Sequence, residues 1–122
     1  MHSRRRRYRS GHWLLAAPLV ACGVTPEPEP TPCVVTAPTE CPEPAPRWAN
    51  VAPIFESRCA SCHDGQPFNP WPLDSYEHVA DWHDVVRDML LNCTMPPVDS
   101  DEKLPPDERD TVLVWIRCGF PE

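Results

Sequence analysis

The uneven distribution of proline is the feature that most limits how this chain can fold. The sequence holds 18 prolines and four glycines, and eight of the prolines fall within residues 23–46. Such a Pro- and Glu-rich stretch favours extended, polyproline-like backbone and buries too little apolar surface to fold alone. We therefore expect a disordered linker over residues 22–46 and one folded domain over residues 47–122. A domain of that size has a marginal core and usually depends on a metal, a cofactor or disulfides.

The first 21 residues have the pattern of an export signal. A basic stretch, MHSRRRRYRS, precedes a short apolar run, Trp13–Ala21, which is too short to span a bilayer. The run ends in LVAC, which resembles the lipobox of bacterial lipoproteins, so we expect Cys22 to be lipidated and to become the new N-terminus. An ordinary signal peptide in which Cys22 is incidental is the alternative. The prediction is a signal peptide of lipoprotein type over residues 1–21 and a domain anchored in the bacterial cell envelope, facing the periplasm. In enteric bacteria an aspartate after the lipidated cysteine retains a lipoprotein at the inner membrane. Gly23 stands at that position here, which leaves the outer membrane open as the location.

Without its first 21 residues the chain is strongly acidic. That segment holds five arginines and no acid, so six Lys or Arg remain beside 18 Asp or Glu, a formal net charge of −12. A surface of this charge disfavours binding to nucleic acid and to anionic lipid. It favours a partner protein with a basic docking patch.

The cysteines divide by position into three groups. One is assigned to lipidation, two form a C-x-x-C motif, and four remain for disulfides, which persist in an exported chain. Of the three ways to pair the four, proximity in the sequence favours Cys33 with Cys41 and Cys93 with Cys118. The second pair would close a loop of about 25 residues and add about 3 kcal/mol to the free energy of unfolding. The seven cysteines are Cys22, Cys33, Cys41, Cys59, Cys62, Cys93 and Cys118.

The sequence CASCH, residues 59–63, is the strongest chemical signal. In c-type haem attachment the thiols of Cys59 and Cys62 would form thioethers with the haem vinyl groups, and His63 would ligate the iron. Zinc would need two further ligands at similar spacing, and a thioredoxin-like redox site would need a βαβ pattern. The sequence offers neither, so covalent haem is the favoured interpretation.

Met95 is the candidate for the sixth ligand that an electron-carrying haem iron needs. It precedes Pro96 and Pro97, which fix an extended turn and would hold the thioether in a loop. His78 and His83 are the alternatives and would give a bis-histidine site of lower potential. Both fall on a predicted amphipathic helix, where exposed histidines are common.

Residues 47–122 are predicted to be helical. The first helix carries an apolar face from Trp48 into CASCH, and Asn50 would cap it so that Pro53 falls in the first turn. A loop follows, and its Phe68 and Trp71 are placed to cover an edge of a haem.

Two further helices complete the predicted domain. One covers residues 73–92 with Asp74 or Ser75 as its cap. The other has Pro106 in its first turn and ends at Gly119. The apolar positions expected to form the core from these helices are Val79, Trp82, Val112, Trp115 and Ile116.

The order of PIFESRCASCH, MPP and ERDTVLVWIRCGFP resembles the small monohaem cytochrome c domain, above all the short bacterial versions that end in a Trp-Ile-x-x-Gly helix. The resemblance covers residues 48–121. It implies an all-α fold of three to four helices around one covalently bound haem c, in which the first and last helices cross. It further implies that Cys59 and Cys62 are the thioether sites, His63 the proximal ligand and Met95 the distal ligand.

These features together predict a membrane-tethered single-electron carrier, not an enzyme, that exchanges electrons with redox partner proteins. One alternative is a sensor or peroxidase-like enzyme in which Met95 does not bind and the sixth iron position is open to a small ligand. Another is a haem-free, disulfide-stapled surface lipoprotein in which Cys59 pairs with Cys62.

Overall fold

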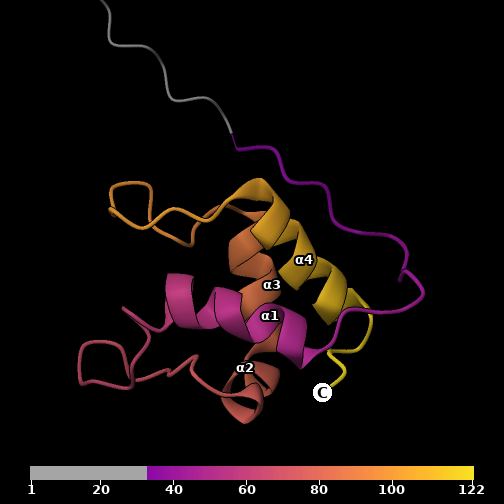
Figure 1. Cartoon of the computed structure of the whole chain (residues 1–122). Coiled ribbons are helices and arrows are strands. Elements are labelled where there is room, and N and C mark those ends of the chain that lie inside the picture. Colours follow the sequence, from indigo (N-terminus) through magenta and orange to yellow (C-terminus); the bar gives the residue numbers. More distant parts are fainter. Residues whose placement is uncertain (1–32) are drawn as a thin grey trace, which may run out of the picture. The chain divides into compact units, whose positions relative to one another are not determined.

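Residues 33–122 are described by the computed structural model, and this part of the chain is all-α, with helices and no strand (Figure 1). The predicted signal peptide and Cys22 lie outside the described residues. No helix among those described is both long and apolar enough to cross a membrane. The elements are α1 (Trp48–Ile54), the π-helix η1 (Phe55–Cys59), α2 (Tyr76–Asp81), α3 (His83–Leu91) and α4 (Pro106–Arg117).

Helix α1 starts three residues earlier than predicted, and it continues directly into η1. Arg47, not Asn50, is the N-cap; the Asn50 side chain accepts a hydrogen bond from the Arg47 backbone N–H at 2.8 Å. Pro53 therefore lies inside the helix, where it cannot donate to the preceding turn. The backbone widens into the π-helix directly after it, with Ala60 N–H donating to Phe55 O at 2.9 Å. Such π-segments are rare and occur mostly at functional sites, and this one ends at Cys59.

The single helix predicted over residues 73–92 is two helices that meet at Trp82. Ser75 caps α2, since its hydroxyl accepts a hydrogen bond from the His78 N–H at 3.3 Å. The ring Nδ1 of His83 lies 2.6 Å from the Ala80 carbonyl, which residue 84 would use in a continuous helix. This side-chain hydrogen bond competes with the helical one and accounts for the break.

Helix α4 matches its prediction and supplies the centre of the core. Pro106 lies in its first turn, and Gly119, with φ of +83°, follows its end. The Trp115 ring is fully buried, and its centroid lies 5.7 Å from the ring centroid of Trp48 and 6.3 Å from that of Phe55. Helix α4 thereby packs against α1, and its other side packs against α3. The buried apolar residues are Val51, Phe55, Leu73, Val79, Leu90, Leu104, Val112, Leu113, Trp115 and Ile116.

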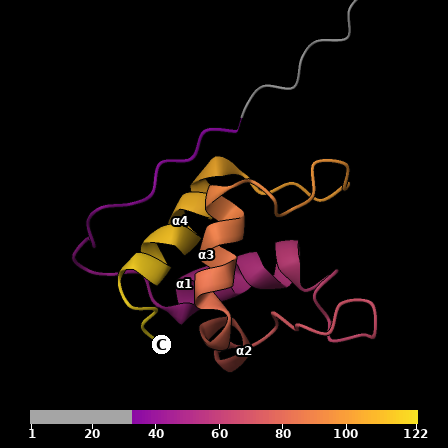
Figure 2. The same cartoon turned by 180° about the vertical axis from the view of Figure 1, so that it is seen from behind.

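The segment over residues 33–46, predicted to be a disordered linker, instead lies along α4 as an extended strap (Figures 1 and 2). Both predicted disulfide pairings are wrong, because the bonds join this strap to the helical domain. The observed disulfides are Cys33–Cys93 and Cys41–Cys118, with Cα atoms 6.2 and 5.2 Å apart.

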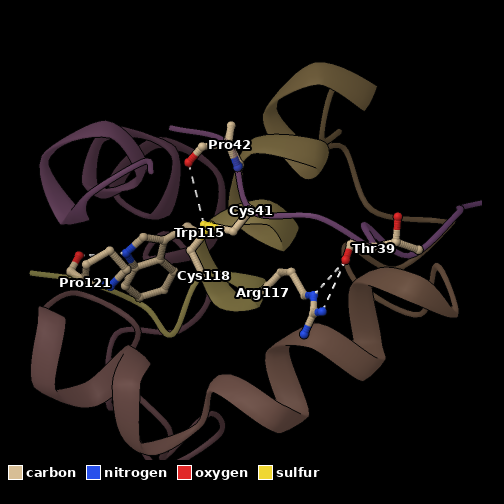
Figure 3. Close-up of a disulfide and its surroundings, with 7 residues drawn as sticks. All are labelled: Thr39, Cys41, Pro42, Trp115, Arg117, Cys118 and Pro121. Carbon is tan, nitrogen blue, oxygen red and sulfur yellow. Dashed lines mark hydrogen bonds between the residues drawn. A yellow bond between two sulfur atoms is a disulfide. The ribbon is translucent and has the colours of Figure 1, made fainter. Parts of the chain in front are cut away.

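The strap is also held by hydrogen bonds beside the second disulfide. The guanidinium of Arg117 donates to the carbonyl of Thr39 at 3.1 Å, next to Cys41 and Cys118 (Figure 3). The prediction paired cysteines that are close in the sequence, which is the preference of an unfolded chain. In the folded chain the strap reaches both ends of α4, and its cysteines meet distant partners. The two bonds close loops of 60 and 77 residues, and each would contribute about 4 kcal/mol in the chain-entropy model.

We expect mass spectrometry of the non-reduced protein to yield these two linkages. Cleavage after Glu40 separates the Cys33 peptide from the Cys41 peptide, and tryptic cleavage after Lys103 and Arg117 separates Cys93 from Cys118. The linked peptides should be Cys33 with Cys93 and Cys41 with Cys118, and reduction should separate the two peptides of each pair. A peptide that joins Cys93 to Cys118 would contradict the structure and restore the pairing expected from the sequence.

Candidate cofactor site

A mainly apolar cavity of about 370 Å³ lies between the CASCH segment and the loop that carries Met95. The two segments that bound it, residues 60–73 and 92–105, project from the same side of the helices (Figures 1 and 2). All four residues predicted to hold haem line this one cavity, so the fold brings them together across 36 positions of sequence. They are Cys59, Cys62, His63 and Met95.

Two free thiols occupy one wall of the cavity. Cys59 ends η1, and the Cys62 N–H donates to the Cys59 carbonyl at 3.1 Å, so the motif forms a compact turn. Cys59 and Cys62 are not bonded to each other, whereas the other four described cysteines are paired. Burial raises the pKa of Cys59 to about 11, with smaller contributions from nearby acidic groups including Glu102. A thiol with so high a pKa is poorly suited to thiol–disulfide exchange at neutral pH.

The ring of His63 is oriented by a backbone carbonyl. Its Nδ1 lies 3.1 Å from Trp71 O, a geometry in which Nδ1–H donates and Nε2 keeps its lone pair. The backbone around the ring is fixed as well, since His63 N–H donates to Cys59 O at 2.8 Å and Leu73 N–H donates to His63 O at 3.0 Å. A neutral imidazole fixed through its other nitrogen is the usual arrangement of a metal-ligating histidine.

Met95 enters the cavity lining from a loop that follows α3. The backbone N–H groups of Thr94 and Met95 both donate to the carbonyl of Met89, at 3.0 and 3.4 Å. Cys93 has φ of +55°, which turns the chain out of the helix, and Pro96 and Pro97 also line the cavity. Met95 is 36% exposed, so it lies at the surface of the domain and not in the hydrophobic core.

An arginine connects the motif to the opposite wall. Arg58 makes two hydrogen bonds to Glu108, at 2.8 and 3.2 Å, and one to Glu102 at 3.4 Å. The hydrogen bonds that Arg58 donates to Glu108 and Glu102 raise the pKa of Arg58, which stays charged. Because Glu108 belongs to α4 and Glu102 to the loop before it, Arg58 ties η1 to both.

The alternative histidine ligands lie away from the cavity. The His83 ring packs on Phe120 with centroids 4.4 Å apart, and His78 Nδ1 lies 2.7 Å from an Asp74 carboxylate oxygen. Neither lines the cavity, whereas Met95 lines it from the loop after α3 and Met89 lines it from α3 itself. Of the two aromatic residues expected to cover a haem edge, Trp71 lines the cavity, whereas Phe68 is 99% exposed and does not.

One side of the cavity was assigned by the sequence to the hydrophobic core. Trp82, which was expected in the core, lines the cavity together with Val85 and Met89, which recur with it at helical spacing. In the structure Trp82 is 40% and Val85 46% exposed, which distinguishes them from core residues. Amphipathic spacing in the sequence cannot make this distinction, because a helix face that packs on the core and one that lines a cofactor cavity have the same spacing.

No protein-family model, curated protein or solved structure matches the chain. Within residues 33–122, no three His, Cys, Asp or Glu side chains gather into a group that could hold a metal ion. The site is thus defined by its own geometry: two free thiols, one oriented imidazole and two thioethers, those of Met89 and Met95, around an apolar space.

We expect the two thiols of the haem-free chain to differ in reactivity. Raising the pKa of Cys59 to about 11 lowers its thiolate fraction at neutral pH about a hundredfold below that of a thiol of pKa 9. Iodoacetamide should therefore modify exposed Cys62 first, and the rate at Cys59 should keep rising as the pH approaches 11. Single variants Cys59→Ser and Cys62→Ser, each with one free thiol among residues 33–122, allow the rates to be read separately by mass spectrometry. Equal rates at pH 8 would show that Cys59 is not buried as described.

Proposed function

We propose that this protein is a monohaem c-type cytochrome that carries single electrons. In this proposal Cys59 and Cys62 hold the haem covalently, His63 is its proximal ligand and Met95 its distal ligand. The haem supplies one-electron redox chemistry when bound. The protein binds it, provides both axial ligands and limits the access of water to the iron.

The observation that carries the proposal is the convergence of CASCH and Met95 on one apolar cavity. The donor set fits haem c in chemical type. Two adjacent thiols are unpaired, and an imidazole holds its Nδ1 against a carbonyl, with Nε2 free to ligate. The thioether of Met95 lines the same cavity, and the remaining walls are mainly aliphatic and aromatic, as a porphyrin plane requires. A zinc site would use thiolates and imidazoles together and would not need the apolar walls.

Two further residues support the site by holding its walls. Trp71 presents its carbonyl to His63 and its ring to Trp82, with ring centroids 6.1 Å apart. Arg58 fastens the helix that ends at Cys59 to α4 through Glu108. We propose that these contacts keep the two axial ligands at a fixed separation, since a fixed ligand geometry limits reorganisation during electron transfer.

A partner for this domain would carry a basic patch. The cations of the described residues are all engaged within the protein. Arg87, for example, pairs with Asp84 at 3.1 Å and with Asp88 at 3.0 Å, and Lys103 donates to backbone carbonyls. The excess of carboxylates is therefore left to face solvent. We propose that a redox partner protein recognises this acidic surface and that Cys22, when lipidated, tethers the domain to a membrane of the cell envelope.

An absorption spectrum of the chain, expressed with a c-type haem maturation system, tests the proposal. We expect haem that survives denaturing electrophoresis, sharp low-spin bands on reduction and a weak sulfur-to-iron band on oxidation. Replacing both motif cysteines, Cys59→Ser with Cys62→Ser, should abolish covalent attachment. The absence of covalent haem in the parent protein would refute the proposal and favour the haem-free lipoprotein.

The Met95→Ala variant separates the electron carrier from a ligand-binding haem protein. It should keep the covalent haem, lose the sulfur-to-iron band, lower the reduction potential and bind carbon monoxide in the reduced state. Met89→Ala is the matched control, because Met89 lines the same cavity from α3. If Met95→Ala leaves spectrum and potential unchanged, Met95 is not a ligand, and high-spin bands in the parent would identify an open iron position.

Membrane attachment is tested by Cys22→Ala. The variant should appear in the soluble fraction of the cell envelope, whereas the parent should partition with membranes because of its acyl chains. Haem content, which depends on CASCH and not on Cys22, serves as the internal control. A Cys22→Ala protein that still partitions with membranes would end the lipid-anchor hypothesis.

A further inference from the structure

We infer that the Cys33–Cys93 disulfide is a positioning device for Met95, and that it keeps the distal ligand in place while Cys41–Cys118 serves stability alone. This inference rests on the proposed function, because it concerns the haem ligand named there. It adds that the strap, residues 33–46, takes part in setting the properties of the site.

The position of Cys93 is the first support. Cys93 stands two residues before Met95, at the point where the chain leaves α3 with φ of +55°. A non-glycine residue in this region of φ is strained and persists only where the surroundings fix it. The disulfide to Cys33 supplies such a constraint, since it attaches this residue covalently to the strap.

The Met95 loop has few other restraints. Residues 93–97 make four backbone hydrogen bonds: the N–H groups of Cys93, Thr94 and Met95 donate to carbonyls of α3, and the Pro97 carbonyl accepts from the Ser100 N–H. Pro96 and Pro97 cannot donate, and Met95 itself is 36% exposed. A loop of this kind belongs to the least stable part of a fold unless something holds it. The disulfide is the strongest restraint within two residues of the thioether.

The strap end that carries Cys33 is in turn seated on α4. Arg109 Nη1 lies 3.7 Å from Cys33 Sγ, and Arg109 Nε is buried without a hydrogen-bond partner. Further along, Val35 packs against the hydrophobic core. Cys33, the residue to which Cys93 is bonded, is thus itself held against α4. The disulfide therefore connects Cys93 to the helical domain through a restrained part of the strap.

The second disulfide provides a matched control within the same molecule. Cys41–Cys118 joins the same strap to the other end of α4, closes a loop of similar length and lies beside Arg117 and Thr39 (Figure 3). Neither Cys41 nor Cys118 lines the cavity. Removing it should cost comparable stability without touching the Met95 loop.

The experiment compares Cys33→Ser/Cys93→Ser with Cys41→Ser/Cys118→Ser in the full-length haem-loaded protein. The first pair should lose the sulfur-to-iron band, lower the potential and bind carbon monoxide in the reduced state; the second pair should keep the parent values. In the Met95→Ala background, removal of Cys33–Cys93 should shift the potential no further, because the disulfide acts through Met95. Retention of band and potential in the first pair, or equal loss in both, would overturn the inference.

Two further measurements keep the test decisive. Amide hydrogen exchange at Thr94 and Met95 should quicken about tenfold, or about 1.4 kcal/mol, in the first pair only. Hydrogen exchange can be measured without haem. If the parent protein lacks the sulfur-to-iron band, Met95 is not the ligand, and the exchange rates still show whether the disulfide restrains the Met95 loop. If Cys33→Ser/Cys93→Ser fails to fold, Cys41→Ser/Cys118→Ser can be folded first and its remaining described disulfide then reduced with a phosphine. Carbon monoxide binding that does not change on this reduction would again overturn the inference.

Discussion

Burial of the Trp115 indole is the contact on which the rest of the structure depends. The helices are 5 to 12 residues long, too short to be stable in isolation, so tertiary packing must hold them. The ring meets Trp48 and Phe55 from the first helical stretch and lies 6.4 Å from Tyr76 at the start of α2. Its Nε1–H donates to Pro121 O at 2.9 Å, and the same carbonyl accepts from the Trp48 N–H at 2.9 Å. One side chain therefore fixes α1, α2 and the C-terminus on α4, and it satisfies its own polar atom in doing so.

The cavity follows from that arrangement. Phe55, Leu90 and Val112 belong to the packed core and also line the cavity, so the core and the cavity share these residues. An apolar space of about 370 Å³ deprives its lining of dispersion contacts, and water gains few hydrogen bonds there. A large planar apolar group would restore those contacts. The proposed haem is therefore supported by packing as well as by the CASCH motif, and the two arguments are independent, because one concerns the walls and the other the ligands.

Sequence patterns predicted what depends on local chemistry and failed where distant segments meet. The all-α class, helix α4 with its Pro106 start, and the burial of Trp115 follow from periodicity and capping, and the structure confirms them. Residues of CASCH and Met95 could be selected because their chemistry is distinctive, and they do line one cavity. The break at Trp82 escaped prediction because a side-chain hydrogen bond causes it. The disulfides were mispaired because the strap was taken as a linker, and proline-rich composition does not reveal that a covalent bond holds an extended segment in place.

The strap also changes how the charge of the protein can act. An acidic domain on a long, free linker would reorient without restraint, and its carboxylates would steer partners equally from any direction. Because Cys33 is joined to Cys93, the described chain instead leaves the domain beside the Met95 loop, at one edge of the cavity. Any membrane tether attached before residue 33 would then restrain the domain at this edge. The disulfide beside the proposed distal ligand thereby also fixes the point at which such a tether would join the domain.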